Sequence, residues 1–344
     1  MKSIINNTLE ELQQFVADND LPKYRAKQIL TEIYSTHHLD FEEMTTLPLA
    51  LQQKLAEQFV VTDIVHADEN RDPDGTIKYL FRMLNGKEIE SVIIPQRNSE
   101  NMTLCISSQE GCKMNCKFCG TGKLGFKSNL SAGEILSQYL VAEDISARKI
   151  SNIVFMGMGE PLDNFKEVVK SLKIILNEQK LLGKNRITVS TAGLPDKIKS
   201  LADTGLNVKL ALSLHSAQQK RRENIMPLAA TNRLSDIVPA LEYYYQKTSQ
   251  PITFEYILFH NFNDTPEDLK QLKRICSHFP SKINLIQYHN IDFTGFELNL
   301  TPASSTEIYE FAIELKKAGI DVFTRISAGN SIKAACGQLA LAKK

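Results

Sequence analysis

The 344-residue chain has 40 Lys and Arg residues against 40 Asp and Glu residues, so its formal net charge is zero and it lacks the overall positive charge typical of nucleic-acid-binding proteins. Its composition, 42% hydrophobic and 23% charged, is that of a globular protein with ample material for a core. No run of about 18 or more apolar residues occurs, and the N-terminus lacks an apolar signal-peptide segment. We therefore expect a cytoplasmic protein with no membrane association.

Residues 1–95 predict a small N-terminal accessory domain made of helices and a β-hairpin. The segment TLEELQQFVADN opens with Thr8, followed three residues later by Glu11, which is the capping-box pattern of a helix start. A second amphipathic helix is expected in PKYRAKQILTEIY. Residues 74–95 alternate apolar and polar side chains around Asn85-Gly86, which is typical of a two-residue hairpin turn.

Residues 96–344 change to an alternation of strands and helices, which indicates parallel βα units. Six strands are expected, in MTLCIS, NIVFMGMG, RITVSTA, VKLALSLH, ITFEYILF and INLIQY, with a short final strand in DVFTRIS. The predicted fold class is α/β, a partial (β/α)6 TIM-like barrel preceded by the accessory domain. In a parallel barrel the active site gathers at the C-terminal ends of the strands. These ends carry a cysteine-rich run, Gly157 to Glu160, Ser190 and Ser213 to His215.

The cysteine-rich run holds Cys112, Cys116 and Cys119 in the spacing C-x3-C-x2-C, with Phe118 before the last cysteine. Three thiolates leave a tetrahedral or cubane metal site one ligand short. A [4Fe-4S] cluster with three cysteine ligands keeps one iron open, whereas structural zinc requires a fourth protein ligand, for which Cys105 is the candidate. Zinc cysteines usually come as two C-x2-C pairs and the chain supplies no second pair, so the cluster is favoured.

Basic residues that could contact a nucleic acid occur only in local groups, each of which taken alone also fits a solvated surface. They are Lys23, Arg25, Lys27, Lys113, Lys117, Lys123, Lys127, Arg221 and Arg222.

Several motifs in one order resemble the RlmN/Cfr family of radical S-adenosylmethionine (SAM) RNA adenine methyltransferases, and the likeness runs almost from end to end. The motifs are IESVIIP, TLCISSQEGC, CKMNCKFCGTG, NIVFMGMGEPLDN, RITVSTAG, LALSLHS, FEYILF and AACGQL. The resemblance implies a [4Fe-4S] cluster on Cys112, Cys116 and Cys119. It also implies SAM contacts from Gly159, Glu160, Ser190, Ser213, Leu214, His215 and His289.

The resemblance further implies a two-cysteine mechanism. Adenine C2 and C8 are electrophilic carbons, so an ordinary polar transfer of the SAM methyl group to them fails. In the family pattern Cys336 accepts a methyl group from one SAM, and the radical derived from a second SAM removes hydrogen from that S-methyl group. The carbon radical adds to adenine, and Glu90 is the proton acceptor. Cys105 then resolves the resulting thioether by attacking the sulfur of Cys336, which forms a disulfide that must later be reduced. Cys276 matches no motif and is expected in the core.

The implied substrates are 23S rRNA and tRNA near the anticodon, with flavodoxin or ferredoxin as electron donor and a monomeric protein. Methylation at adenine C2 is the prediction, and the C8-methylating branch of the family is the alternative. Two others come from different classes: a zinc-bearing RNA-binding protein without catalysis, and a radical enzyme acting on a small molecule. The sequence departs from the family pattern at NLIQYHN, where His289 replaces an Asn and Asn290 could take its role, and at Ser331, where Asp is common.

Overall fold

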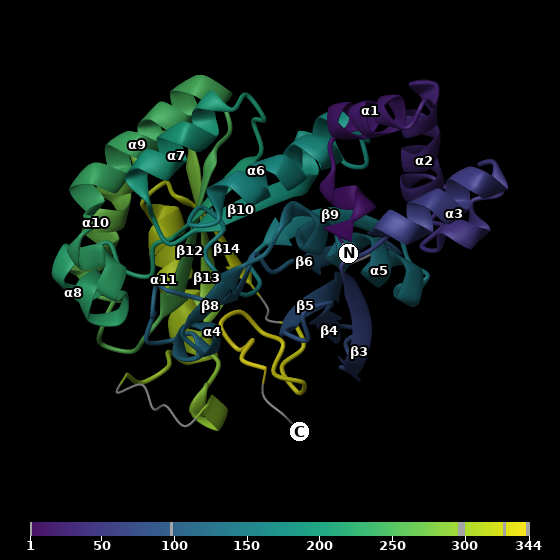
Figure 1. The fold of residues 1–344 in the computed structure, drawn as a ribbon. Coiled ribbons are helices and arrows are strands. Elements are labelled where there is room, and N and C mark those ends of the chain that lie inside the picture. The colour runs from purple at the N-terminus through teal and green to yellow at the C-terminus, as the bar shows by residue number, and fades with distance from the viewer. Residues whose placement is uncertain (1, 97–98, 295–299, 326–327, 342–344) are drawn as a thin grey trace.

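The protein is organised around a ten-stranded mixed sheet (Figure 1). The computed structural model describes residues 2–96, 99–294, 300–325 and 328–341. Parallel pairing links neighbouring strands in the order β14, β13, β12, β11, β10, β9, β6. These strands are β6 (Met102–Cys105), β9 (Ile150–Phe155), β10 (Ile187–Thr191), β11 (Lys209–Ser213), β12 (Ile252–Leu258), β13 (Ser281–Gln287) and β14 (Asp321–Arg325). The prediction of an α/β fold of this type, including the short final strand, is confirmed.

Helices connect the parallel strands and cover the outside of the sheet (Figure 1). They are α5 (Ala132–Ser146), α6 (Phe165–Lys173), α7 (Pro195–Asp203), α8 (Gln219–Ile225), α9 (Leu234–Thr248), α10 (Pro266–Cys276) and α11 (Ser305–Lys317). Capping boxes start α5, α10 and α11. Each cap satisfies backbone amides that a helix start leaves unpaired, so the crossovers are locally well defined. Because the strands are parallel, the loops that follow them meet at one end of the sheet.

Three helices precede the sheet: α1 (Leu9–Asp18), α2 (Tyr24–Tyr34) and α3 (Leu49–Gln58). The predicted capping box is present, since Thr8 Oγ1 accepts from Glu11 N at 3.2 Å and Glu11 Oε2 accepts from Thr8 N at 2.7 Å. Two short strands, β1 (Lys2–Ser3) and β2 (Phe59–Val60), pair in parallel and enclose this helical part. No helix in the described part of the chain has the length and apolar character needed to cross a lipid bilayer.

Antiparallel strands β3 (Ile64–Arg71), β4 (Ile77–Met83) and β5 (Glu88–Pro95) extend the same sheet beyond β6. A turn at the predicted place joins β4 to β5, but its loop has three residues, Leu84 to Gly86, where two were predicted, because Met83 N donates to Lys87 O at 2.8 Å. Gly86 has φ +82°, and its N–H donates to Met83 O at 2.9 Å. In the pairing of β5 with β6, Val92 lies opposite Cys105. The sheet therefore continues across the predicted boundary at residue 95, and the division into domains 1–95 and 96–344 stays a prediction.

A small hairpin of β7 (Gln109–Gly111) and β8 (Phe126–Asn129) encloses the cysteine-rich run and the short helix α4 (Gly120–Lys123). Gly111 has φ +76°, and a Cβ atom placed there would lie 1.7 Å from Gly125 O. Only glycine permits this close approach of the two strands.

The terminal segment, residues 328–341, forms no helix or strand and runs back beneath β4 and β5 (Figure 1). Its first part is attached to the turn between β3 and β4, because Gly329 N donates to Asp74 Oδ2 at 3.0 Å and Ser331 Oγ donates to Asp72 Oδ2 at 2.6 Å. The hydrogen bond from Ser331 is the main reason that the pKa of Asp72 is lowered. The Ser331 departure from the family pattern thus has a partner on the sheet.

Candidate active site

A cavity of about 150 Å³ opens at the C-terminal ends of the parallel strands. Nine of the predicted site residues line it: Cys112, Cys116, Cys119, Gly159, Glu160, Ser190, Ser213, His215 and Cys336. Other lining residues include Phe118, Met156, Met226, Ile257 and Ile286. The loops after β6, β9, β10 and β11 and the terminal segment thus converge on one site, as expected for a parallel barrel.

Cys112, Cys116 and Cys119 lie on the loop between β7 and α4. Burial raises the pKa of the Cys112 thiol to about 12, with further contributions from Cys119 and Glu160, and it raises the pKa values of Cys116 and Cys119 in the same way. Three neighbouring thiols that disfavour ionisation need a positively charged partner to become thiolates. The three cysteines therefore form a site suited to a metal centre.

A structural zinc ion would require a fourth protein ligand beside the three cysteines. Cys105, the proposed fourth zinc ligand, lines a different cavity. The arrangement fits a larger cluster with three cysteine ligands.

Glu160 presents a buried carboxylate, 3% exposed, beside the cysteines. Its Oε2 accepts from Ala192 N at 2.7 Å and its Oε1 accepts from Leu162 N at 3.0 Å. Burial raises the pKa of this carboxyl to about 7. A bound ammonium group would favour the ionised form, so the position suits the amino end of an amino-acid ligand such as SAM.

Gly159, just before Glu160, has φ +99°, and a Cβ atom there would lie 2.5 Å from Gln109 Cβ. Gln109 is itself held in place, since its side chain donates to Asn129 and Asp163 and accepts from Glu160 N. Residue 159 is therefore restricted to glycine both by its conformation and by its neighbour.

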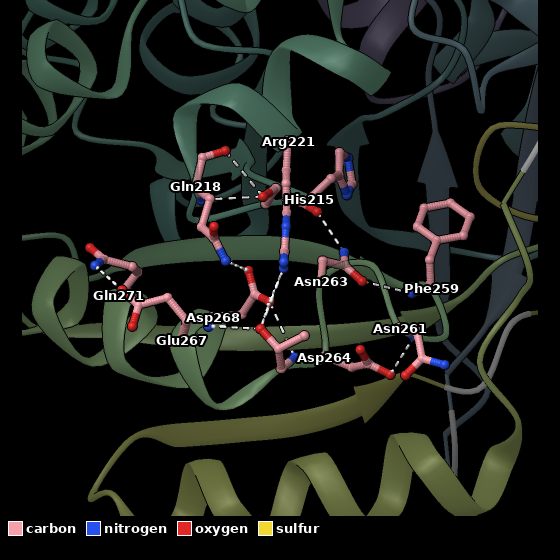
Figure 2. Close-up of polar contacts among 12 residues, drawn as sticks. His215, Gln218, Arg221, Phe259, Asn261, Asn263, Asp264, Glu267, Asp268 and Gln271 are labelled. Atoms are coloured by element: carbon pink, nitrogen blue, oxygen red, sulfur yellow. Dashed lines mark hydrogen bonds and ion pairs between the residues drawn. The ribbon is translucent and has the colours of Figure 1, made fainter.

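His215 is buried and has φ +51°. Its Nδ1 accepts from Ile257 N at 3.1 Å, and its ring packs edge-on against Phe118 with centroids 4.5 Å apart. Its carbonyl oxygen accepts from Asn263 Nδ2 at 2.7 Å (Figure 2). Burial lowers the pKa of the imidazole to about 3, with a further contribution from Arg222. His215 is thus a neutral ring with its proton on Nε2, fixed in orientation against Phe118.

Arg222 belongs to a local basic group that fits a solvated surface by sequence alone, and the structure corrects that prediction. Its side chain is fully buried, and its Nε and Nη2 atoms donate to the carbonyl oxygens of Leu214, Ala192 and Ser213 at 2.5–3.2 Å. Nη1 has no hydrogen-bond partner in the described structure. Arg221, the preceding residue, instead points to Asp268 with Nη1–Oδ2 2.6 Å (Figure 2). Arg222 therefore ties together the ends of two strands that line the cavity.

A second cavity brings Cys105 and Cys336 together. Both residues line it, with Ile94, Met156, Ala335 and Leu339 among their neighbours. Cys105 is the last residue of β6 and is 8% exposed. Cys336 lines the first cavity as well. None of the six cysteines forms a disulfide in the structure.

Other predicted site residues lie outside both cavity walls. Leu214 is fully buried, and its carbonyl oxygen accepts from Arg222. His289 does not line either cavity, whereas Ile286 of the same strand region lines both. Asn290 contributes a carbonyl oxygen to Gln338 Nε2 at 3.0 Å. Glu90 is 3% exposed and contacts the terminal segment. Cys276 is half-buried in α10 and packs against the core.

Comparison with known proteins places this geometry in a family. Residues 106–274 match the radical SAM superfamily, and residues 3–61 match the ribosomal RNA large subunit methyltransferase N-terminal domain. The chain is similar to a protein named "Probable dual-specificity RNA methyltransferase RlmN" from Salinibacter ruber (strain DSM 13855 / M31), at 39% identity over 96% of this chain and 91% of the relative. A protein of the same name from Chloroherpeton thalassium (strain ATCC 35110 / GB-78) is 41% identical over 97% and 92%.

A crystal structure of a radical SAM methyltransferase from Sphaerobacter thermophilus is similar with a TM-score of 0.92 and 34% identity, covering 98% of this chain and 99% of that one. The superfamily match identifies a [4Fe-4S] cluster and SAM as the cofactors. Cys112, Cys116 and Cys119 would hold the cluster, and the buried Glu160 fits the SAM amino group. The chain belongs to the RlmN/Cfr family of the radical SAM superfamily.

Proposed function

We propose that this protein is a radical SAM RNA methyltransferase that converts an adenosine to 2-methyladenosine in 23S rRNA and also in tRNA beside the anticodon. The names of the relatives, which describe dual-specificity RNA methyltransferases, support an RNA substrate and favour two kinds of RNA. Electron supply by flavodoxin or ferredoxin and a monomeric state belong to the same proposal.

One observation carries the proposal: Cys336 lines both the cavity of the three clustered cysteines and the cavity of Cys105. A thiol in this position can be methylated on one side and resolved on the other without leaving its place in the chain. An enzyme that used only the cluster would not require a second thiol at the boundary between two cavities.

The cluster and SAM, when bound, supply the methyl group and the 5′-deoxyadenosyl radical. Cys112, Cys116 and Cys119 would hold the cluster, and Glu160 would orient the SAM amino group. Gly159, Ser190, Ser213 and His215 shape the remaining wall. The apolar neighbours Phe118, Met226 and Ile257 exclude water from the site where the radical forms.

Cys336 would carry the one-carbon unit to the adenine. Addition of the S-methylene carbon radical to C2 gives an odd-electron adduct, so a thioether between the Cys336 sulfur and the base requires loss of the C2 proton and of one electron, for which the oxidised cluster, when bound, would be the acceptor. The Cys105 thiolate would then attack the sulfur of Cys336. A sulfur–sulfur bond forms, and the sulfur–carbon bond breaks with its electron pair remaining on carbon, which takes up a proton. A two-electron reductant then restores both thiols.

Glu90 is proposed as the acceptor of the adenine C2 proton. In the structure both its oxygens are engaged by other protein groups, since Oε1 contacts Lys78 Nζ at 3.0 Å and Oε2 accepts from two backbone amides. It also lines neither cavity. Action as a base would therefore require the terminal segment to move.

The regiochemistry is tested by anaerobic reconstitution of the protein, incubation with 23S rRNA fragments or tRNA transcripts, and mass spectrometry of the digested nucleosides. We expect 2-methyladenosine in both RNAs and none with Cys336→Ala. If 8-methyladenosine were the only product, the protein would belong to the C8-methylating branch of the family. Absence of any methylated adenosine from a fully reconstituted protein would contradict an RNA methyltransferase of either kind.

A further inference from the structure

Lys78 and Glu90 form a buried ion pair that contacts the terminal segment. Lys78 lies on β4 and Glu90 on β5, and their side chains are 7% and 4% exposed with Nζ–Oε1 3.0 Å. In the antiparallel register Lys78 faces Val92 and Leu80 faces Glu90, so the two are diagonal neighbours across the hairpin. Removing two charges from water is costly unless further hydrogen bonds satisfy their remaining atoms.

Those further hydrogen bonds come from the terminal segment. Glu90 Oε2 accepts from Ala340 N at 2.9 Å and from Leu341 N at 3.1 Å, and Lys78 Nζ donates to Lys333 O at 3.4 Å. The pair thus gains partners on both sides of residue 336. Its burial is well compensated only when the terminal segment lies on it.

Between these contacts the segment is attached to the helix beside the clustered cysteines. Gly120 N donates to Gly337 O at 2.6 Å, and Thr121 Oγ1 donates to Leu339 O at 2.6 Å. Cys336 lines the first cavity together with Cys119. Cys336 is therefore held between the ion pair on the accessory hairpin and the loop that carries the cluster ligands.

We propose that Lys78 and Glu90 are positioning residues that dock the terminal segment and thereby place Cys336 between the two cavities. In this docked arrangement Glu90 acts through the backbone of the segment. The importance of this placement rests on the proposed function, but the docking itself is measured without turnover. An uncharged pair at these positions binds the segment more weakly, because a Gln oxygen is an uncharged acceptor for the two amides and Met has no donor for Lys333 O. Cys336 then spends more time exposed.

The test is the rate at which iodoacetamide alkylates Cys336 in the anaerobically reconstituted protein, measured by peptide mass spectrometry with Cys276 as internal reference. We compare Glu90→Gln and the double variant Lys78→Met/Glu90→Gln, in which neither buried charge is left alone. The matched control is Arg82→Met/Glu88→Gln, which removes the exposed Arg82–Glu88 pair (Nη2–Oε1 2.9 Å) from the same hairpin.

We expect both Glu90 variants to raise the Cys336 rate by roughly tenfold, with Cys276 unchanged and the control equal to the unmodified protein. Unchanged Cys336 rates in the folded variants would overturn the proposal. A faster Cys276 rate would show that the variant is unfolded. The hydrogen-exchange measurement on the wild-type protein then decides whether the segment is docked. In hydrogen exchange the amides of Ala340 and Leu341 should be protected although they lie at the chain end, and exchange at the rate of a free peptide would reject docking.

The same variants separate docking from proton abstraction. If Glu90 only accepts a proton, Glu90→Gln still forms the protein–RNA thioether, in the yield seen with Cys105→Ala, and Cys336 alkylation is unchanged. If Glu90 docks the segment, the thioether yield falls together with faster alkylation. Loss of methylation by the wild-type protein, with the alkylation differences intact, would reject the proposed function and leave docking in place.

Discussion

Replacing Gly159 by alanine offers a quantitative check on the geometry of the site. The glycine has φ +99°, a conformation that costs an L-residue about 1–2 kcal/mol. Its added Cβ would also meet Gln109 Cβ at 2.5 Å and Gln109 N at 2.8 Å, and overpacking of this kind costs about 1–3 kcal/mol. Gln109 is fully buried and has hydrogen bonds at both ends of its amide, so it has little freedom to retreat.

The matched control is Gly86→Ala. Gly86 has φ +82°, and a Cβ there would have no atom within 4 Å. We expect Gly86→Ala to lower the free energy of unfolding by about 1–2 kcal/mol and Gly159→Ala to lower it by about 2–5 kcal/mol. Urea unfolding under reducing conditions, followed by circular dichroism, measures both. Equal losses in the two variants would show that the close contact with Gln109 has no energetic consequence.

Three further predictions concern the buried groups around the cavity. Since the pKa of His215 is about 3 in the folded protein and near 6.5 when unfolded, only the unfolded chain takes up this proton as the pH falls through that range. The free energy of unfolding should therefore decline with falling pH by up to about 1.4 kcal/mol per pH unit from this group. In urea unfolding below neutral pH, His215→Gln should flatten this pH dependence. An unchanged pH dependence would mean that His215 is protonated in the fold. Arg222→Met removes the donors to three buried carbonyl oxygens and should lower the free energy of unfolding by about 1–3 kcal/mol for each unsatisfied group. Arg222→Lys should recover part of this loss. A loss below about 0.5 kcal/mol in the same assay would contradict these contacts. Anaerobic purification followed by metal analysis should give about four iron and four sulfide per chain and much less in Cys116→Ser, whereas zinc without sulfide would identify a structural metal site.

Local patterns in the sequence were sufficient to predict the fold. The capping box of Thr8 and Glu11 and the turn at Asn85-Gly86 each depend on residues close in the chain. Both are present, although the loop of the turn is one residue longer than predicted. The alternation of strands and helices likewise predicted the parallel part of the sheet. The cysteine spacing and the strand-end motifs predicted residues that converge on one cavity, because parallel strands bring their C-terminal ends together.

Arg221 and Arg222 show what a local pattern does not contain. They are adjacent and of the same type, yet one forms an ion pair with Asp268 and the other is fully buried among strand-end carbonyls. Which of them points inward depends on the face that the short helix α8 presents to the sheet, and a seven-residue helix with few apolar residues gives little periodicity to indicate it.

The Lys78–Glu90 site was also beyond sequence reasoning. Glu90 contacts residues 250 and 251 positions away, and its partners there are backbone amides, which carry no sequence signature. In the sequence, Glu90 is marked only by its resemblance to a family position, and that resemblance does not indicate its contacts. His289 is a comparable case: its place in a motif predicts a SAM contact, Ile286 of the same region lines the cavity, and the His289 contact stays a prediction.

The pairing of Cys105 with Cys336 is the central claim, and trapping the reaction between them tests it most directly. The reconstituted Cys105→Ala and Cys336→Ala variants are incubated with substrate RNA and SAM under reducing conditions, and covalent protein–RNA species are quantified by denaturing electrophoresis and mass spectrometry. We predict a thioether-linked species attached at residue 336 in Cys105→Ala and none in Cys336→Ala. Normal turnover in either variant, or attachment of the RNA at another residue, would contradict the account.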